Sequence, residues 1–256
     1  KRARLKYVLD DMGLDWTRKE LERQFGRVLA DPLPHAPFQV PDHLGWHEQG
    51  DGRFWLGLPV ASGRIEDGPK VRLRTALRAL FENWAKPSVL TPQQDILIAD
   101  IAPSERDEIE AHLRSHGVVF AEDLTAVRRW TLACPALPTC GLALSEAERI
   151  REPLVDSIEA ALRKHGLIEE RISIRITGCP NGCARPYAGD IGLVGRTPGT
   201  FALFVGGDFE GTRLNTKLTE KVPEASIADT LDPLLGAFAR ERLPGEGFGD
   251  WCHRQG

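Results

Sequence analysis

Hydrophobic and polar residues follow two periods along this 256-residue chain. A period of two, typical of strands, runs through residues 171–177, where isoleucines at positions 172, 174 and 176 share one face. Residues 71–84 and 226–241 carry apolar side chains at helical spacing instead. The second of these helices contains Pro233, so its first turns are hard to delimit. Strands and helices in one chain predict a mixed structure.

Further segments complete this pattern. Strands are expected at residues 53–60, 95–101, 190–195 and 200–207. Three helix starts carry capping residues. They are the capping boxes Thr17–Glu20 and Ser145–Glu148, the latter opening a helix through about Lys164, and Ser104, which opens a helix to about residue 116.

The order of these elements predicts an α+β fold with two two-layer α/β units. Residues 1–43 are expected to be a helical lead-in followed by a proline-rich connector. Residues 44–122 are expected to form the first α/β unit. Residues 123–256 are expected to form the second unit.

Composition narrows the function classes. The chain has 33 basic and 37 acidic residues and lacks a basic-aromatic patch, so no nucleic-acid partner is expected. It has no apolar run near the roughly 20 residues that span a membrane, so no membrane partner is expected. The chain starts with KRARLK and without Met. A cytoplasmic location is expected, or a plastid if an amino-terminal transit peptide is missing.

Four cysteines carry the strongest chemical signal. Cys134 and Cys140 form a C-x5-C pair in ACPALPTCGLAL, and Cys179 and Cys183 form a C-x3-C pair in TGCPNGCARPY. Four thiolates delivered by Pro- and Gly-rich turns suit an iron–sulfur cluster. A structural zinc site or buried structural cysteines remain open on spacing alone, although the C-x5-C pair fits zinc poorly. Cys252 has no partner at a suggestive spacing.

The sequence around the cysteines resembles that of the carboxy-terminal half of siroheme-dependent assimilatory sulfite reductases, which belong to the sulfite and nitrite reductase family. The resemblance rests on both cysteine segments and continues through LFVGGDFEGTRLN (203–215), GEGFGDW (245–251) and LGWHEQGDGRFWLGLPVASGRI (44–65). It implies half of a pseudo-symmetric architecture. Residues 44–122 would be its ferredoxin-like half-domain, and residues 123–256 its siroheme- and 4Fe–4S-binding domain.

The resemblance also implies site residues. Cys134, Cys140, Cys179 and Cys183 would bind one 4Fe–4S cluster, and Cys183 would bridge the cluster to the siroheme iron. The backbone N–H groups of Gly178, Asn181 and Gly182 are candidates for hydrogen bonds to the cluster. Candidates for contacts with siroheme are Arg185, Arg196, Arg213 and, more weakly, Gln94 in the TPQQD loop.

The implied activity is the six-electron reduction of sulfite to sulfide, with electrons from ferredoxin or an NADPH flavoprotein. A nitrite reductase forming ammonia, a cluster protein that only carries electrons and a zinc-stapled module are the alternatives. The family's other half, which supplies most of the basic residues that grip sulfite, has no counterpart here. The chain is therefore expected to be a fragment or one piece of a split enzyme.

Overall fold

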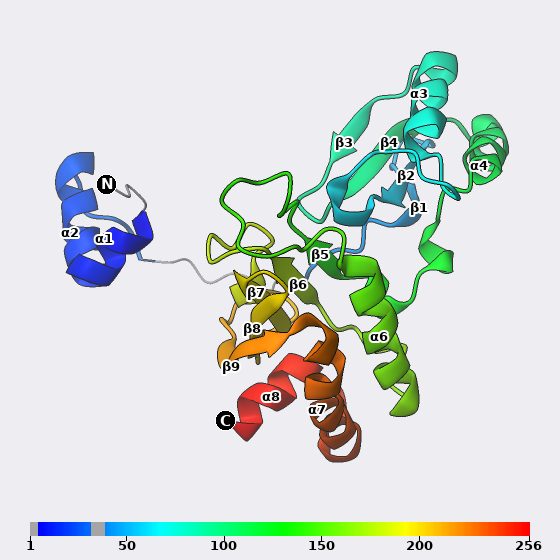
Figure 1. Cartoon of the computed structure of the whole chain (residues 1–256). Helices are drawn as coiled ribbons and strands as arrows, with labels where there is room; N and C mark the ends of the chain where they lie inside the picture. Colours follow the sequence, from blue (N-terminus) through cyan, green and yellow to red (C-terminus); the bar gives the residue numbers. More distant parts are fainter. Residues whose placement is uncertain (1–4, 32–38) are drawn as a thin grey trace. The chain divides into compact units, whose positions relative to one another are not determined.

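The computed structural model describes residues 5–31 and 39–256, and the chain divides into two compact units, residues 1–39 and 40–256 (Figure 1). The first unit is a pair of helices, α1 (Leu5–Met12) and α2 (Leu14–Phe25). Gly13 separates them with φ +80°, and Gly26 ends α2 with φ +74°. Both values suit glycine. These helices lie where the sequence predicted helical structure, while most of the proline-rich connector lies outside the described residues.

The capping box expected at Thr17 is wrong. Helix α2 already begins at Leu14, so Thr17 lies inside it, and its Oγ1 donates to the carbonyl of Gly13 at 2.9 Å. This bond to the residue four positions earlier is the usual interaction of a threonine within a helix. Glu20 accepts hydrogen bonds from Arg23 and Gln24 instead of closing a box.

The second unit begins with an antiparallel sheet of four strands in the order β1-β2-β4-β3. Alternation of buried residues places Leu56, Leu58, Ile96 and Ile98 in one core with the apolar residues of two helices. The elements are β1 (Gly45–Glu48), β2 (Phe54–Pro59), α3 (Leu73–Trp84), β3 (Ser88–Leu90), β4 (Asp95–Ile101) and α4 (Arg106–Ser115). The helix and strands expected in this part are confirmed, and short strands β1 and β3 are added.

A five-stranded sheet follows, in the order β5-β6-β7-β8-β9. Strands β5, β6 and β7 run parallel, while β8 and β9 continue the sheet antiparallel. Figure 1 shows α6, α7 and α8 gathered beside this sheet, and their apolar residues join its largest core. The elements are α5 (Ala126–Arg129), β5 (Thr131–Ala133), α6 (Arg151–Lys164), β6 (Ile174–Thr177), β7 (Ile191–Thr197), β8 (Thr200–Val205), β9 (Thr216–Pro223), α7 (Ile227–Glu241) and α8 (Phe248–Gln255).

Most elements expected in this region are confirmed. Ile172, Ile174 and Ile176 do lie together in the core, although strand β6 is shorter than the alternation suggested. Pro233 falls within the second turn of α7, which a single-turn 3-10 helix precedes. The two sheets with their helices confirm the α+β class. None of the described helices is long and apolar enough to cross a membrane.

The two other helix caps are also wrong. Helix α6 begins at Arg151 and not after Ser145, because tertiary contacts hold the preceding residues. The carboxylate of Glu148 pairs with Arg64 of the segment that follows β2, with Nη2 and Oε2 2.7 Å apart. Ser104 lies within a 3-10 turn, where the Glu105 carboxylate accepts from the Ala102 N–H at 2.8 Å.

Candidate functional site

The two cysteine segments leave the sheet at the same edge. Strands β5 and β6 are parallel neighbours, so their carboxyl ends meet there. Cys134 follows β5, and its N–H donates to the carbonyl of Ile176 at 3.0 Å, which extends the ladder by one bond. Cys179 lies two residues after β6. The fold therefore brings together two cysteine segments whose first cysteines, Cys134 and Cys179, are 45 positions apart along the chain.

Gly178 holds the two segments against each other. Its carbonyl accepts hydrogen bonds from the N–H groups of Leu144 at 2.8 Å and Ser145 at 3.0 Å. Its own N–H lies 3.3 Å from Sγ of Cys134, within range of an N–H···S bond. A Cβ at position 178 would lie 2.6 Å from the carbonyl oxygen of Ser145 and 2.7 Å from Cβ of Ala136. Only glycine allows this close approach.

The thiols have unequal environments. Cys179 is buried, Cys134 and Cys140 are half-buried, and Cys183 is exposed. Burial raises the pKa of the Cys134 thiol, and the nearby thiols of Cys183 and Cys179 raise it further. These three sulfurs therefore lie close enough to affect one another. The N–H of Cys140 donates to Ala136 at 2.7 Å, which folds the first segment back on itself.

This arrangement fits a cluster in its donor set and its backbone. Within residues 5–31 and 39–256, no group of three or more His, Cys, Asp or Glu residues could hold a single metal ion. An iron–sulfur cluster is bound from outside by cysteine thiolates arranged around its core. The N–H of Gly178 already points at a cysteine sulfur, an interaction that tunes the reduction potential of such clusters.

The turn after Cys179 is tightly wound. Gly182 has φ +71° and donates its N–H to the Cys179 carbonyl at 3.4 Å. Asn181 is exposed, so its side chain is free to face a ligand. Arg185 has φ +56°, an uncommon value for a residue with a Cβ. Strain of this kind gathers where surrounding structure enforces it.

Gln94 joins the first sheet to the first cysteine segment. Its Nε2 donates to the carbonyl of Ala133 at 2.7 Å, and its Oε1 accepts from the Ala133 N–H at 3.2 Å. Arg185 reaches the same loop, where its Nη2 donates to the carbonyl of Pro92 at 3.2 Å. Gln94 thus positions the residue before Cys134. Its amide is occupied, so a direct contact with siroheme stays a prediction that this geometry does not favour.

Arg196 and Arg213 are engaged in the protein. Nε of Arg196 lies 3.2 Å from Glu220 of β9, at the far edge of the sheet. Arg213 donates to the carbonyl of Gly206 at 2.9 Å and to Asp250 of α8 at 2.7 Å. Neither contact involves a cysteine segment, so their role as siroheme contacts also stays a prediction.

Two residues near the site were not expected from the sequence. The ring of Tyr187 packs edge-on against Phe204 at 5.2 Å and lies under Gly182. Arg175 is buried in β6, just before the second cysteine pair. Arg175 occupies a polar position of the alternating residues 171–177, so no local signal marked its burial. No local signal marked Tyr187 either.

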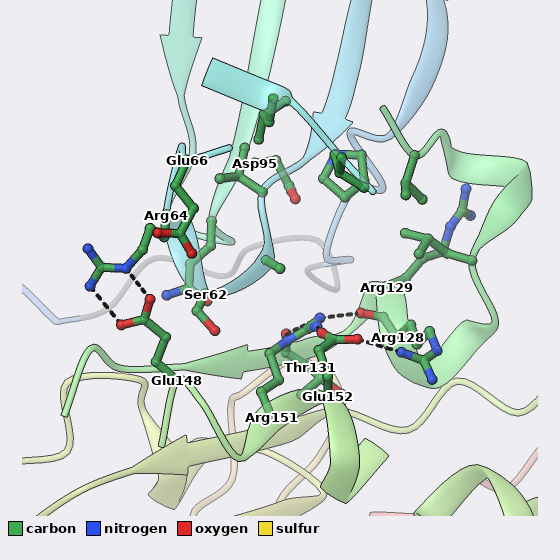
Figure 2. A pocket seen from close by; sticks show the side chains of 18 of the residues that line it. Ser62, Arg64, Glu66, Asp95, Arg128, Arg129, Thr131, Glu148, Arg151 and Glu152 are labelled. Atoms are coloured by element: carbon green, nitrogen blue, oxygen red, sulfur yellow. Dashed lines mark hydrogen bonds and ion pairs between the residues drawn. The ribbon is translucent and has the colours of Figure 1, made fainter. Parts of the chain in front are cut away.

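A cavity of about 850 Å³ lies between the first sheet and the start of α6 (Figure 2). None of the four cysteines lines it. Burial raises the pKa of Asp95 in its wall to about 7, while Arg151 donates to the carbonyls of Thr131 and Arg128. Five arginines and five carboxylates line the cavity, so its walls favour neither cations nor anions: Arg64, Arg128, Arg129, Arg149, Arg151, Glu66, Asp95, Asp123, Glu148 and Glu152.

Gly178→Ala is expected to lower cluster content sharply. The added methyl would collide with Ser145 and Ala136 and push the two cysteine segments apart. Overpacking of this kind costs about 1–3 kcal/mol of stability. Iron and acid-labile sulfide per chain, with the melting temperature of the cluster-free protein, measure both effects. The matched control is Gly141→Ala in the first cysteine segment, because no atom lies within 4 Å of a Cβ there. Equal cluster content in the two variants would contradict the role given to Gly178.

Comparison with known proteins agrees with a cysteine-ligated cluster domain. The family described as nitrite and sulphite reductase 4Fe-4S domain matches residues 126–256. The nitrite/sulfite reductase ferredoxin-like half domain matches residues 47–116. Together these matches define the class as redox proteins with a cluster domain and a ferredoxin-like half domain. The chain belongs to the nitrite and sulphite reductase family.

Curated relatives carry sulfite reductase names. Sulfite reductase (ferredoxin) of Synechococcus elongatus is 43% identical over 99% of this chain and 41% of its own length. The sulfite reductase (NADPH) hemoprotein beta-component of Afipia carboxidovorans is 45% identical over 99% of this chain and 44% of its own length. The solved structure of Mycobacterium tuberculosis NirA protein matches with a TM-score of 0.78 and 28% identity, over 98% of this chain and 48% of that one. The chain thus spans less than half the length of these proteins.

Proposed function

We propose that this chain is the cluster- and siroheme-carrying part of a sulfite reductase that converts sulfite to sulfide. The observation that carries the proposal is the interlocking of both cysteine segments at Gly178, at one edge of a parallel sheet. The names of the curated relatives support sulfite as the substrate.

In this proposal Cys134, Cys140, Cys179 and Cys183 hold a 4Fe–4S cluster. Cys183, whose thiol is exposed, would also bind the siroheme iron. The bound cofactors would supply single electrons to sulfite. The chain's own contribution is to orient the thiols through Gly178 and Gln94 and to aim the Gly178 N–H at a ligand sulfur, which tunes the cluster. The amides of Asn181 and Gly182 would act in the same way.

The organisation and partners follow from the same proposal. Residues 1–43 would be the lead-in and connector, residues 44–122 the ferredoxin-like half-domain and residues 123–256 the cofactor domain. Electrons would come from a separate protein, a ferredoxin or an NADPH flavoprotein, as the names of the relatives suggest. We place the protein in the cytoplasm, or in a plastid if a transit peptide precedes the chain.

A visible absorption spectrum tests the cofactor assignment. Chain reconstituted with iron, sulfide and siroheme is expected to show a strong Soret band and a red band from siroheme above the broad absorption of the cluster. A broad brown shoulder alone would indicate an electron carrier without siroheme. A zinc-loaded chain would show no visible bands and would contradict the proposal. Sulfide rather than ammonia as the product of the full-length enzyme separates sulfite from nitrite reduction.

A further inference from the structure

Cys183 has little support of its own, although the proposed function makes it the ligand shared by both cofactors. Its thiol is exposed. It lies in the crossover of residues 178–190, which leaves the carboxyl end of β6 and returns to the start of β7. Among the described residues, neither the backbone nor the thiol of Cys183 takes part in a hydrogen bond. Its position therefore depends on the residues that hold the crossover.

The ring of Tyr187 supports the residue that precedes Cys183. A Cβ on Gly182 would lie 3.2 Å from Cε2 and 3.6 Å from Cδ2 of this ring, so the ring lies directly against the Gly182 backbone. Burial raises the pKa of the Tyr187 hydroxyl, the charge of Arg196 lowers it, and the Cys179 thiol lies near enough to raise it again. The ring is therefore close to both ends of the C-x3-C pair.

The five-stranded sheet supports the ring in turn. Tyr187 packs against a small core of Val194, Ala202 and Phe204 from β7 and β8. Its ring meets that of Phe204 edge-on, with centroids 5.2 Å apart. Leu193 belongs to the larger core beside the helices, so Val194 faces the opposite side of the sheet, because successive side chains of a strand alternate. The sheet thus gives Tyr187 a rigid base on that side.

Asn215, in the segment before β9, holds the backbone around Tyr187. Its N–H donates to the carbonyl of Tyr187 at 2.9 Å. Its side-chain Nδ2 donates to the carbonyls of Pro186 at 2.6 Å and Gly189 at 3.0 Å. Its Oδ1 is buried without a partner among the described residues. The side chain therefore acts as a donor only, and its two bonds offset the cost of an unpaired acceptor.

We propose that Tyr187 is a positioning residue for Cys183, and that Asn215 fixes the turn from which its ring extends. The inference rests on the proposed function, since it takes Cys183 as a cluster ligand. The ring keeps Gly182 close to the sheet and so limits the positions open to the next residue. A thiolate that already lies beside the other ligands loses less entropy when it binds iron, so the cluster is held more tightly.

Iron loss to a chelator tests the inference on the whole chain reconstituted with iron and sulfide. Tyr187→Leu removes the ring, and Asn215→Ala removes its two side-chain bonds. Both variants are expected to lose iron about 10- to 100-fold faster, the range typical of residues that orient a metal ligand. Tyr187→Phe keeps the ring and should keep the original rate. The matched control, which should also keep that rate, is Phe209→Leu, because Phe209 is half-buried too and packs edge-on against Trp130 at 4.9 Å.

Double variants show whether Tyr187 acts through Cys183. Cys183→Ser alone is expected to speed iron loss. Adding Tyr187→Leu to it should change the rate by less than about twofold, because the thiolate that the ring positions is gone. Effects that multiply would show that the ring supports the fold in general, and they would overturn the inference. An unchanged rate in Tyr187→Leu alone would overturn it too.

Hydrogen exchange of the cluster-free chain replaces this cycle if Cys183→Ser takes up no iron. The N–H of Arg185 donates to the carbonyl of Gly182 at 2.8 Å and reports on the turn around Cys183. Tyr187→Leu is expected to speed exchange at this N–H and to leave β7 and β8 protected. Equal acceleration throughout, or none at Arg185, would overturn the inference. An original chain that assembles no cluster, or a Cys183→Ser variant that loses iron no faster, would instead contradict the proposed function.

Discussion

Replacing Cys183 with serine in a full-length enzyme that contains this chain is expected to uncouple the cluster from the siroheme. Cys183 is the last cysteine of the C-x3-C pair and the exposed one, so it can face a second cofactor. A serine oxygen is a poor substitute for a soft thiolate at iron–sulfur centres. Sulfite turnover should fall by more than about 100-fold, beyond the loss typical of residues that only support a ligand. Magnetic coupling between the two iron centres, measured by Mössbauer and EPR spectroscopy, should disappear.

Cys252→Ala provides the control for this experiment. Cys252 lies in α8, is buried in the core and belongs to neither cysteine segment, so its thiol is not among the proposed ligands. This variant should keep its cluster, its coupling and its activity. Normal coupling and full turnover in Cys183→Ser would show that another residue bridges the cofactors.

The chain by itself is expected not to reduce sulfite at a useful rate. It spans less than half the length of the curated relatives that it matches. Among its described residues, the candidate cations beside the cysteines are mostly committed, with Arg213 paired to Asp250 and Arg196 close to Glu220. Sulfite and the siroheme carboxylates together need many positive groups in a confined site. Each missing preorganised donor is worth about 3 kcal/mol, so several would reduce turnover by many orders of magnitude.

The rate of sulfide release tests this prediction. The reconstituted chain receives a strong artificial electron donor, and a full-length relative such as the Synechococcus elongatus protein is assayed in parallel. The visible spectrum of each sample verifies cofactor loading first, so that poor loading is not mistaken for poor chemistry. Turnover by the chain within tenfold or so of the full-length protein would show that these residues are sufficient.

Sequence periodicity predicted the elements whose signal is local. The alternating isoleucines of residues 172–176 located the strand before the second cysteine pair, because a half-buried strand must repeat every two residues. The helical spacing of residues 71–84 located α3 in the same way. The edge strands β3 and β9 were not predicted, because most of their residues are exposed and pairing with a neighbouring strand defines them.

Capping signals failed where contacts from distant residues took precedence. Glu148 has the spacing of a capping box with Ser145, yet Arg64 binds it from 84 residues away and α6 starts later. Thr17 has the right spacing to Glu20, but the helix already begins at Leu14. A cap is worth only about 1 kcal/mol, so one ion pair or one earlier turn can override it.

The sequence by itself determined that the site is of the iron–sulfur class. Four cysteines in Pro- and Gly-rich turns have few chemical uses, and the sequence around them resembles that of one family. The tertiary structure alone decided how those cysteines meet. The parallel pairing of β5 and β6 brings both segments to one edge, and Gly178 can lock them only because no side chain intervenes. The amide of Gln94 bound to Ala133 and the unpartnered guanidinium of Arg175 likewise depend on neighbours that are remote along the chain. Local patterns record which groups are present, whereas partners and distances arise only when the chain folds.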